Sequence, residues 1–208
     1  MHDEPEIRYT APEALARLRE GNERFVRGEA RFPTVQKEVL AELARGQQPY
    51  ATVLGCSDSR VPPELVFDAG FGELFVVRLA GNVLSPEVAG TLQYAGAHLK
   101  TPLFVVLGHE GCGAVRAALQ TLRGGTRERS RIEALLHNIL PGLADVDADL
   151  PEDEQMRQAV EANVRWTVKS ILETPEAQER RGEGVLQLVG AVYDLTTGHV
   201  RFLAPPEG

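Results

Sequence analysis

Cysteine is scarce in this sequence, with 2 residues among 208, and neither a basic N-terminal segment nor a long apolar run is present. Residues 1–6 are acidic and broken by Pro5, so they lack the pattern of a signal peptide. No apolar run is long enough to cross a membrane. We therefore expect a cytoplasmic protein, since thiols stay reduced in that compartment.

Clustered basic residues are missing as well. The chain has 22 Lys and Arg residues against 30 Asp and Glu residues, which gives a formal net charge of −8 and a pI near 5.2. Nucleic acid is not expected as a partner, because a phosphate-binding surface would be basic. A small anionic substrate stays possible, because the local charge at a site can oppose the global sign.

The chain of 208 residues, 43% of them hydrophobic, can bury a sizeable core and suits one domain or at most two. We interpret residues 1–208 as a single domain with three parts. Residues 1–46 form an N-terminal helical arm, residues 47–123 a metal-site core, and residues 124–208 the remaining helices and a terminal hairpin. The sequence contains no internal repeat, nucleotide-binding fingerprint or low-complexity tract.

The segment Cys56–Glu64 (CSDSRVPPE) follows a predicted strand at residues 51–55. Its paired prolines begin a predicted helix, so the thiol of Cys56, the carboxylate of Asp58 and the guanidinium of Arg60 share one turn. Ligand sites in open α/β sheets lie at the carboxyl ends of strands. Asp58 and Arg60 could be an ordinary exposed ion pair. Residues two apart do not meet on a helix, so a special turn must bring them together if they pair.

A second cluster follows the continuous apolar run at residues 103–107, which suits a strand covered on both faces. The run ends in Gly108–Gly113 (GHEGCG), and a helical pattern comes next. His109 and Cys112 therefore also lie at a strand-to-helix turn. If the two strands are parallel neighbours in one sheet, Cys56, His109 and Cys112 converge at one edge.

Two thiolates and an imidazole suit zinc, and three such ligands leave a fourth position free for water. Asp58 could orient that water or occupy the fourth position itself. Cys112 lies near a predicted helix N-terminus, which favours a thiolate. A plain interpretation stays open for each part, because His-x-x-Cys pairs often bind no metal and a buried cysteine is often an inert small hydrophobe.

The two motifs together resemble the β-class carbonic anhydrases. The similarity covers nearly the whole chain and is least distinctive between residues 124 and 184. Further stretches that look like this family are Leu18–Phe25, Gly46–Pro49, Gly72–Arg78, Ala80–Asn82 and Val189–Asp194. The resemblance, together with the run-and-turn pattern, implies an α/β fold: a mostly parallel central sheet flanked by helices, with an N-terminal helical arm and a C-terminal β-hairpin.

The resemblance implies a carbonate dehydratase, an enzyme with a Zn²⁺ cofactor that reversibly hydrates carbon dioxide to bicarbonate and a proton by metal-bound hydroxide. The metal ligands would be Cys56, His109 and Cys112. Asp58 would accept a hydrogen bond from the hydroxide, and Arg60 would hold Asp58 off the metal. The implied substrate-binding residues are Gln47, Phe75, Tyr94 and Gly113.

The family also suggests a homodimer or a dimer of dimers, with the pocket aromatics contributed across the interface. The helix predicted from the capping box Thr10–Glu13 would then lie across a neighbouring subunit, or alternatively cover its own sheet. Members with a noncatalytic bicarbonate pocket have an N-terminal tryptophan, whereas Trp166 is the only one here. This favours a site in which Asp58 stays off zinc.

One position departs from the family pattern, because Leu79 follows Arg78 where an asparagine is usual. Two thiolates should also make zinc-bound water less acidic than three imidazoles would, so something must restore that acidity. The alternative functions are a hydrolase of carbon disulfide or carbonyl sulfide and a zinc-stabilised, non-catalytic binding or regulatory protein.

The remaining pattern predicts a short helix through Val35 and Leu43, a strand at 73–78 and a helix from Ser85 to Leu99. Two helices are expected between 126 and 173, the first ending at Pro141–Gly142. A hairpin is expected at 185–203.

Overall fold

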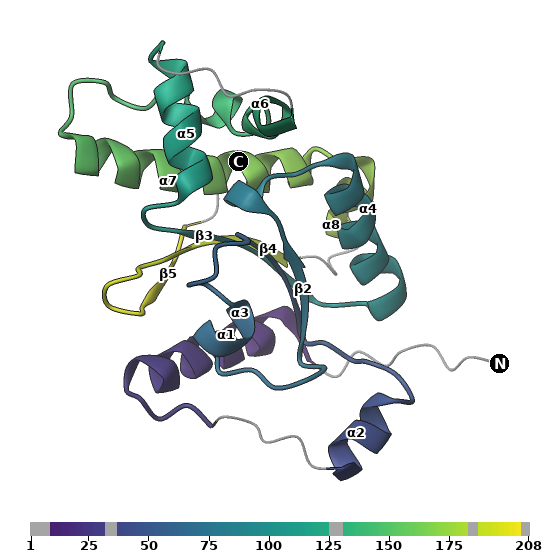
Figure 1. The fold of residues 1–208 in the computed structure, drawn as a ribbon. Helices are drawn as coiled ribbons and strands as arrows, with labels where there is room; N and C mark the ends of the chain where they lie inside the picture. The colour runs from purple at the N-terminus through teal and green to yellow at the C-terminus, as the bar shows by residue number, and fades with distance from the viewer. Residues whose placement is uncertain (1–8, 32–36, 125–130, 183–186, 205–208) are drawn as a thin grey trace.

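A five-stranded sheet forms the centre of the computed structural model, which describes residues 9–31, 37–124, 131–182 and 187–204. The strand order is β2-β1-β3-β4-β5, and only β5 runs antiparallel to its neighbour (Figure 1). The strands are β1 Ala51–Gly55, β2 Leu74–Arg78, β3 Leu103–His109, β4 Gln187–Tyr193 and β5 Val200–Phe202. This confirms the expected mostly parallel sheet with a C-terminal hairpin.

The two motif-bearing strands are neighbours. Thr52 of β1 pairs with Phe104 of β3, and Gly55 pairs with Leu107, so both strands end at the same edge of the sheet. Every residue of β1 and of β3 is buried. Continuous apolar runs give this result because central parallel strands are covered on both faces.

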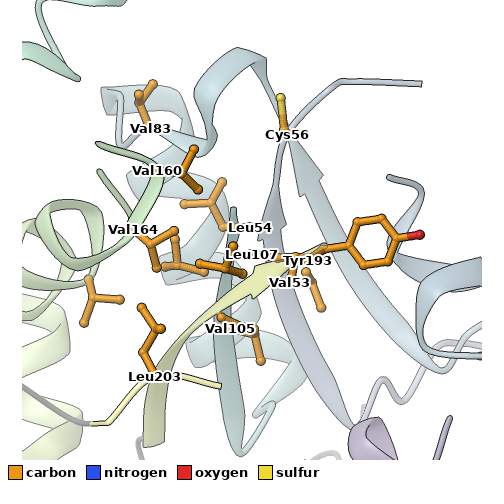
Figure 2. Packing of buried hydrophobic residues seen from close by; sticks show 14 of the residues in the cluster. Val53, Leu54, Cys56, Val83, Val105, Leu107, Val160, Val164, Tyr193 and Leu203 are labelled. Atoms are coloured by element: carbon orange, nitrogen blue, oxygen red, sulfur yellow. The ribbon is translucent and has the colours of Figure 1, made fainter. Parts of the chain in front are cut away.

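Helices cover both faces of the sheet. The long helix α7 (Glu152–Leu172) packs on β3 and β4, with α5 (Gly113–Leu122) against it, while α1 (Ala11–Val26) and α3 (Pro63–Val66) lie on the other side (Figure 1). Figure 2 shows Val160 and Val164 between α7 and the strands. A Cβ added to Gly108 would lie 2.5 Å from Val164 Cγ2, so glycine at this position lets α7 approach the sheet.

The N-terminal helix packs on its own chain. Thr10 and Glu13 form the expected capping box, and Ala14, Leu18, Gly21 and Asn22 are its buried residues. Asn22 ties the helix to the body of the protein, because its amide donates to the carbonyl oxygens of Val66 and Gly198 and its oxygen accepts from Val200 N. Within one chain, α1 therefore packs as in the second of the two arrangements considered above, in which the helix covers its own sheet.

The remaining helical segments correct several details. The helix expected to end at Pro141–Gly142 is broken, with α6 at Arg131–Leu136 and a separate 3-10 turn, η3, at Leu140–Leu143. The predicted helix to Leu99 is α4 (Pro86–Tyr94) followed by a π turn, η2 (Ala95–Leu99). The sequence patterns missed α8 (Pro175–Gly182), whereas α2 (Lys37–Leu43) and the 3-10 turn η1 (Ala80–Asn82) fall in segments already singled out.

Two predicted positions, Val35 and Val185, lie outside the described residues. Within the described part of the chain, none of the helices combines the length and apolar character needed to span a membrane.

Candidate metal centre

Cys56, His109 and Cys112 converge where β1 and β3 end. Their ligand atoms all lie within 4.8 Å of one another, and the three residues are 5%, 1% and 1% exposed. Cys56 follows β1, His109 is the last residue of β3, and Cys112 is the N-cap of α5. The two sulfurs are 3.9 Å apart and both thiols are free. The structure therefore brings together the three residues that the sequence motifs singled out.

The imidazole of His109 is oriented for a ligand at Nε2. Its Nδ1 lies 3.0 Å from the carbonyl oxygen of Glu110, which can only accept, so Nδ1 carries the proton. Nε2 then presents a lone pair, and it is buried with no hydrogen-bond partner among the described residues. A ring fixed through one nitrogen, with the other directed at two sulfurs, is the usual arrangement of a metal-binding histidine.

The two thiols influence each other's protonation. A hydrogen bond from Cys112 lowers the pKa of Cys56, against the opposing effect of burial, and His109 and the backbone N–H groups of Gly81 and Asp58 contribute further. The same sulfur pair raises the pKa of Cys112, and burial adds to that increase. The shared hydrogen bond therefore shifts the two thiol pKa values in opposite directions.

Asp58 and Arg60 form the pair that the sequence suggested, through a turn closed by Val61 N on the carbonyl oxygen of Asp58. Arg60 Nε and Nη2 lie 2.9 and 2.7 Å from the two carboxylate oxygens. These bonds hold the pKa of Asp58 well below its usual range. Asp58 Oδ2 remains 3.9 Å from His109 Nε2, so the carboxylate borders the cluster while it is engaged by arginine.

Sequence reasoning did not assign a role to the segment that holds this turn in place. Arg78 donates to the carbonyl oxygens of Cys56 and Asp58 at 2.9 and 2.6 Å. Leu79 pairs through its backbone with Gly55 and Ser57, and Gly81 N donates to Cys56 Sγ at 3.4 Å. Leu79, the residue that departs from the family pattern, thus contributes main-chain bonds to the turn. Sequence patterns could not have revealed these hydrogen bonds, because the contacts of a single arginine at the end of an edge strand, and of the backbone after it, produce no hydrophobic periodicity.

The expected substrate-binding residues are not gathered at this cluster. Gln47 precedes β1 and lines a groove of about 650 Å³ at the amino end of the sheet, with Tyr50 and Glu73. The five-residue strand β1, which is about 17 Å long at about 3.3 Å per residue, lies between Gln47 and Cys56 in the chain. Phe75 and Tyr94 lie together, with ring centroids 6.2 Å apart, and Tyr94 is 46% exposed.

Gly113, the fourth of these expected residues, does lie beside the cluster. It is the first residue of α5, directly after Cys112, and is exposed, with open space where a Cβ would lie.

Comparison with known proteins identifies a family for most of the chain. Residues 51–200 match the family model described as carbonic anhydrase. Carbonic anhydrase 2 of Mycobacterium tuberculosis is 41% identical over 186 residues, which cover 87% of this chain and 87% of that protein.

Solved structures give the same result. A β-carbonic anhydrase of the fungal pathogen Aspergillus fumigatus superposes with a TM-score of 0.73 at 28% identity, covering 93% of this chain and 91% of that one. A tetrameric β-carbonic anhydrase of Sordaria macrospora also gives a TM-score of 0.73 at 28% identity, covering 80% of this chain and 86% of that one.

Proposed function

This chain belongs to the β-class of the carbonic anhydrase family and catalyses the reversible hydration of carbon dioxide, and we propose that Cys56, His109 and Cys112 hold a zinc ion for that reaction. The observation that carries the proposal is the buried convergence of two sulfurs and one unpartnered imidazole nitrogen within 4.8 Å. Sulfur and nitrogen are donors that zinc accepts, and three protein ligands are typical of a catalytic site.

When bound, zinc supplies Lewis-acid chemistry that lowers the pKa of water at the site toward 7, so that a nucleophile is available near neutral pH. The chain's own residues then orient the reactants. Asp58 is ionised across the neutral range, and it accepts a hydrogen bond from the attacking water, which directs the oxygen lone pair at carbon dioxide. The products are bicarbonate and a proton.

Arg60 keeps that carboxylate in place. Because it occupies both oxygens of Asp58, the carboxylate is held beside the cluster and does not become a fourth protein ligand. Arg78 supports the same arrangement from the backbone side of the turn. This geometry supports the open form of the site, in which the fourth position is left to water.

The substrate pocket, in this proposal, is completed by a second copy of the chain. Gln47 is at the far end of β1 from its own Cys56, so it can reach a ligand cluster only if that cluster belongs to a neighbour. Phe75 and Tyr94 form a partly exposed apolar pair on the β2 side of the sheet, which suits a wall for carbon dioxide. Gly113 borders the pocket from the cluster's own chain.

A homodimer, or a dimer of dimers, is therefore the assembly we propose, and the tetrameric Sordaria macrospora relative is consistent with it. The free thiols 3.9 Å apart are consistent with a reducing compartment, and we propose the cytoplasm. No observation favours hydrolysis of carbon disulfide or carbonyl sulfide, or a non-catalytic zinc protein.

Stopped-flow hydration of carbon dioxide, with metal analysis of the same sample, tests the proposal. We expect one zinc per chain and a hydration rate well above that of buffer. The activity should disappear with the metal on chelation and return when zinc is added back. Stoichiometric zinc without hydration would contradict the catalytic role, and a metal-free active protein would contradict the zinc site.

A further inference from the structure

The 3-10 turn η1 (Ala80–Asn82) places a backbone donor on one of the proposed metal ligands. Gly81 N lies 3.4 Å from Cys56 Sγ and donates to it. A peptide N–H directed at a thiolate stabilises its negative charge and withdraws electron density from the sulfur. The orientation of the peptide group between Ala80 and Gly81 therefore affects how strongly Cys56 donates to a bound metal.

The backbone of η1 leaves no room for a side chain at Gly81. Its φ of 73° lies in the left-handed region, and the next residue, Asn82, also has a positive φ of 44°. A Cβ added to Gly81 would lie 2.7 Å from Ile139 Cδ1 and 3.2 Å from Ala114 Cβ. Glycine adopts the left-handed region readily, whereas a positive φ is less common for Asn82, so contacts from elsewhere help to hold the turn in place.

One such contact comes from the middle of α7. Asn163 is 0% exposed, and its Nδ2 donates to the carbonyl oxygen of Gly81 at 2.8 Å. The two hydrogen bonds lie on opposite sides of the Gly81 Cα, so anchoring the carbonyl restricts the rotation that would turn the N–H away from Cys56. Figure 2 shows the surrounding layer, where Val83, Val160 and Val164 lie between α7 and the strand that ends at Cys56.

Packing does not explain an asparagine at this position. Its neighbours on the buried face of α7 include Val160 and Val164, and the Oδ1 atom of Asn163 has no partner among the described residues. An apolar side chain of similar size would bring no unpaired polar atom of its own into this layer. Its donor group therefore supplies what a leucine could not, namely the bond to Gly81.

We propose that Asn163 is a positioning residue which, through the backbone of Gly81, directs an N–H at Cys56 Sγ and so weakens the electron donation of that thiolate to the metal. The inference rests on the proposed zinc site. It offers one answer to how a centre with two thiolates keeps its water acidic, because part of the thiolate charge is directed into a hydrogen bond rather than toward the ion.

The test uses the full-length enzyme with cobalt(II) in place of zinc, since thiolate-to-cobalt charge-transfer absorption reports electron donation by sulfur. N163L removes the donor and keeps the size of the side chain, and N163A removes the donor and leaves space. We expect both variants to shift the charge-transfer band to longer wavelength, although only N163A leaves a cavity.

T167V is the matched control. Thr167 lies one turn further along the same buried face of α7, is 1% exposed, and has a hydroxyl without a partner among the described residues. The valine variant can change the unfolding temperature but should leave the band unshifted. A band that coincides with wild type in both Asn163 variants, or an equal shift in T167V, would overturn the inference. A wild-type cobalt form without any thiolate band would instead refute the metal centre itself.

Discussion

The ligand cluster and the expected substrate-binding residues lie in two contrasting regions. Cys56, His109 and Cys112 are buried, come from adjacent strand ends, and are complete within one chain. Gln47 lies at the amino end of β1, and Phe75 and Tyr94 lie on the β2 side, where the edge strand is only partly covered.

This difference separates what the fold of one chain can build from what needs an assembly. Parallel neighbouring strands bring their carboxyl ends together whatever the chain is bound to. Residues at the opposite end of a strand cannot join that site without a second copy. The predictions below test the two regions in turn, starting with the largest expected effect.

Loss of one of the three proposed metal ligands should abolish zinc binding and catalysis. In C112S the cluster keeps one sulfur and one nitrogen, so we expect no stoichiometric zinc and hydration at the uncatalysed rate, measured by metal analysis and stopped flow. H137A is the control, because His137 is exposed on the chain just after α6 and should retain both properties. A C112S protein with full zinc and activity would show that the ligand set is wrong.

Removal of the Asp58 carboxylate should leave the metal and reduce the rate. We expect D58A to bind zinc normally and to lose about 100- to 1,000-fold in kcat, the range typical of removing one positioned hydrogen-bonding group. Metal content and kcat are measured on the same preparation. Unchanged kcat in D58A would mean that the carboxylate is a spectator beside the cluster.

The attachment of α1 to its own chain depends on Asp68, which is 4% exposed. Burial would raise the pKa of Asp68, but hydrogen bonds from Arg24 and Arg31 outweigh that effect and lower it. We expect D68N to reduce the free energy of unfolding at pH 7 by about 2–3 kcal/mol, since hydrogen bonds to a charged group are lost.

The pH dependence of this effect has a definite sign. A lowered folded-state pKa stabilises the protein above the unfolded pKa of about 3.9, and that contribution is lost as the pH falls below it. Denaturant titrations at pH 7 and near pH 3 should therefore show the difference between wild type and D68N becoming smaller in acid. The exposed Asp153, in D153N, should change little at either pH, and a D68N effect independent of pH would contradict the ion-pair explanation.

Subunit complementation tests whether Gln47 acts on a neighbour. We expect Q47A alone to lower kcat/KM by about 10-fold, the cost of about one hydrogen bond to substrate. Co-refolded Q47A and D58A chains should recover about a quarter of the wild-type sites, because half of the random dimers carry one intact site of two. A mixture no more active than the average of its parents would show that Gln47 does not act in the site of a neighbouring chain.

The smallest expected effect is at the start of α1. Thr10 accepts from Glu13 N and closes the capping box, so T10A should cost about 1 kcal/mol in unfolding free energy and leave the zinc content and kcat unchanged. A change in kcat would mean that the first turn of α1 influences the site, and it would link the helix to the region of Gln47, Phe75 and Tyr94.

The central strands of the sheet and the convergence of Cys56, His109 and Cys112 could be predicted from the sequence, for physical reasons. Continuous apolar runs predicted β1 and β3, and the reactive residues directly after them predicted the edge at which they meet. Asn163 was beyond such reasoning, because a polar residue within an apolar helical face is visible in a sequence but its partner, the Gly81 carbonyl 82 positions away, is not. The break after α6 was missed for a related reason, since the apolar spacing up to Leu140 fits one continuous helix.

X-ray absorption spectroscopy at the zinc edge of the purified full-length protein tests the central claim most directly. The account predicts two sulfur scatterers at about 2.3 Å and two lighter atoms at about 2.0–2.1 Å, one from His109 and one from water. A first shell without sulfur, or with a single sulfur, would contradict it.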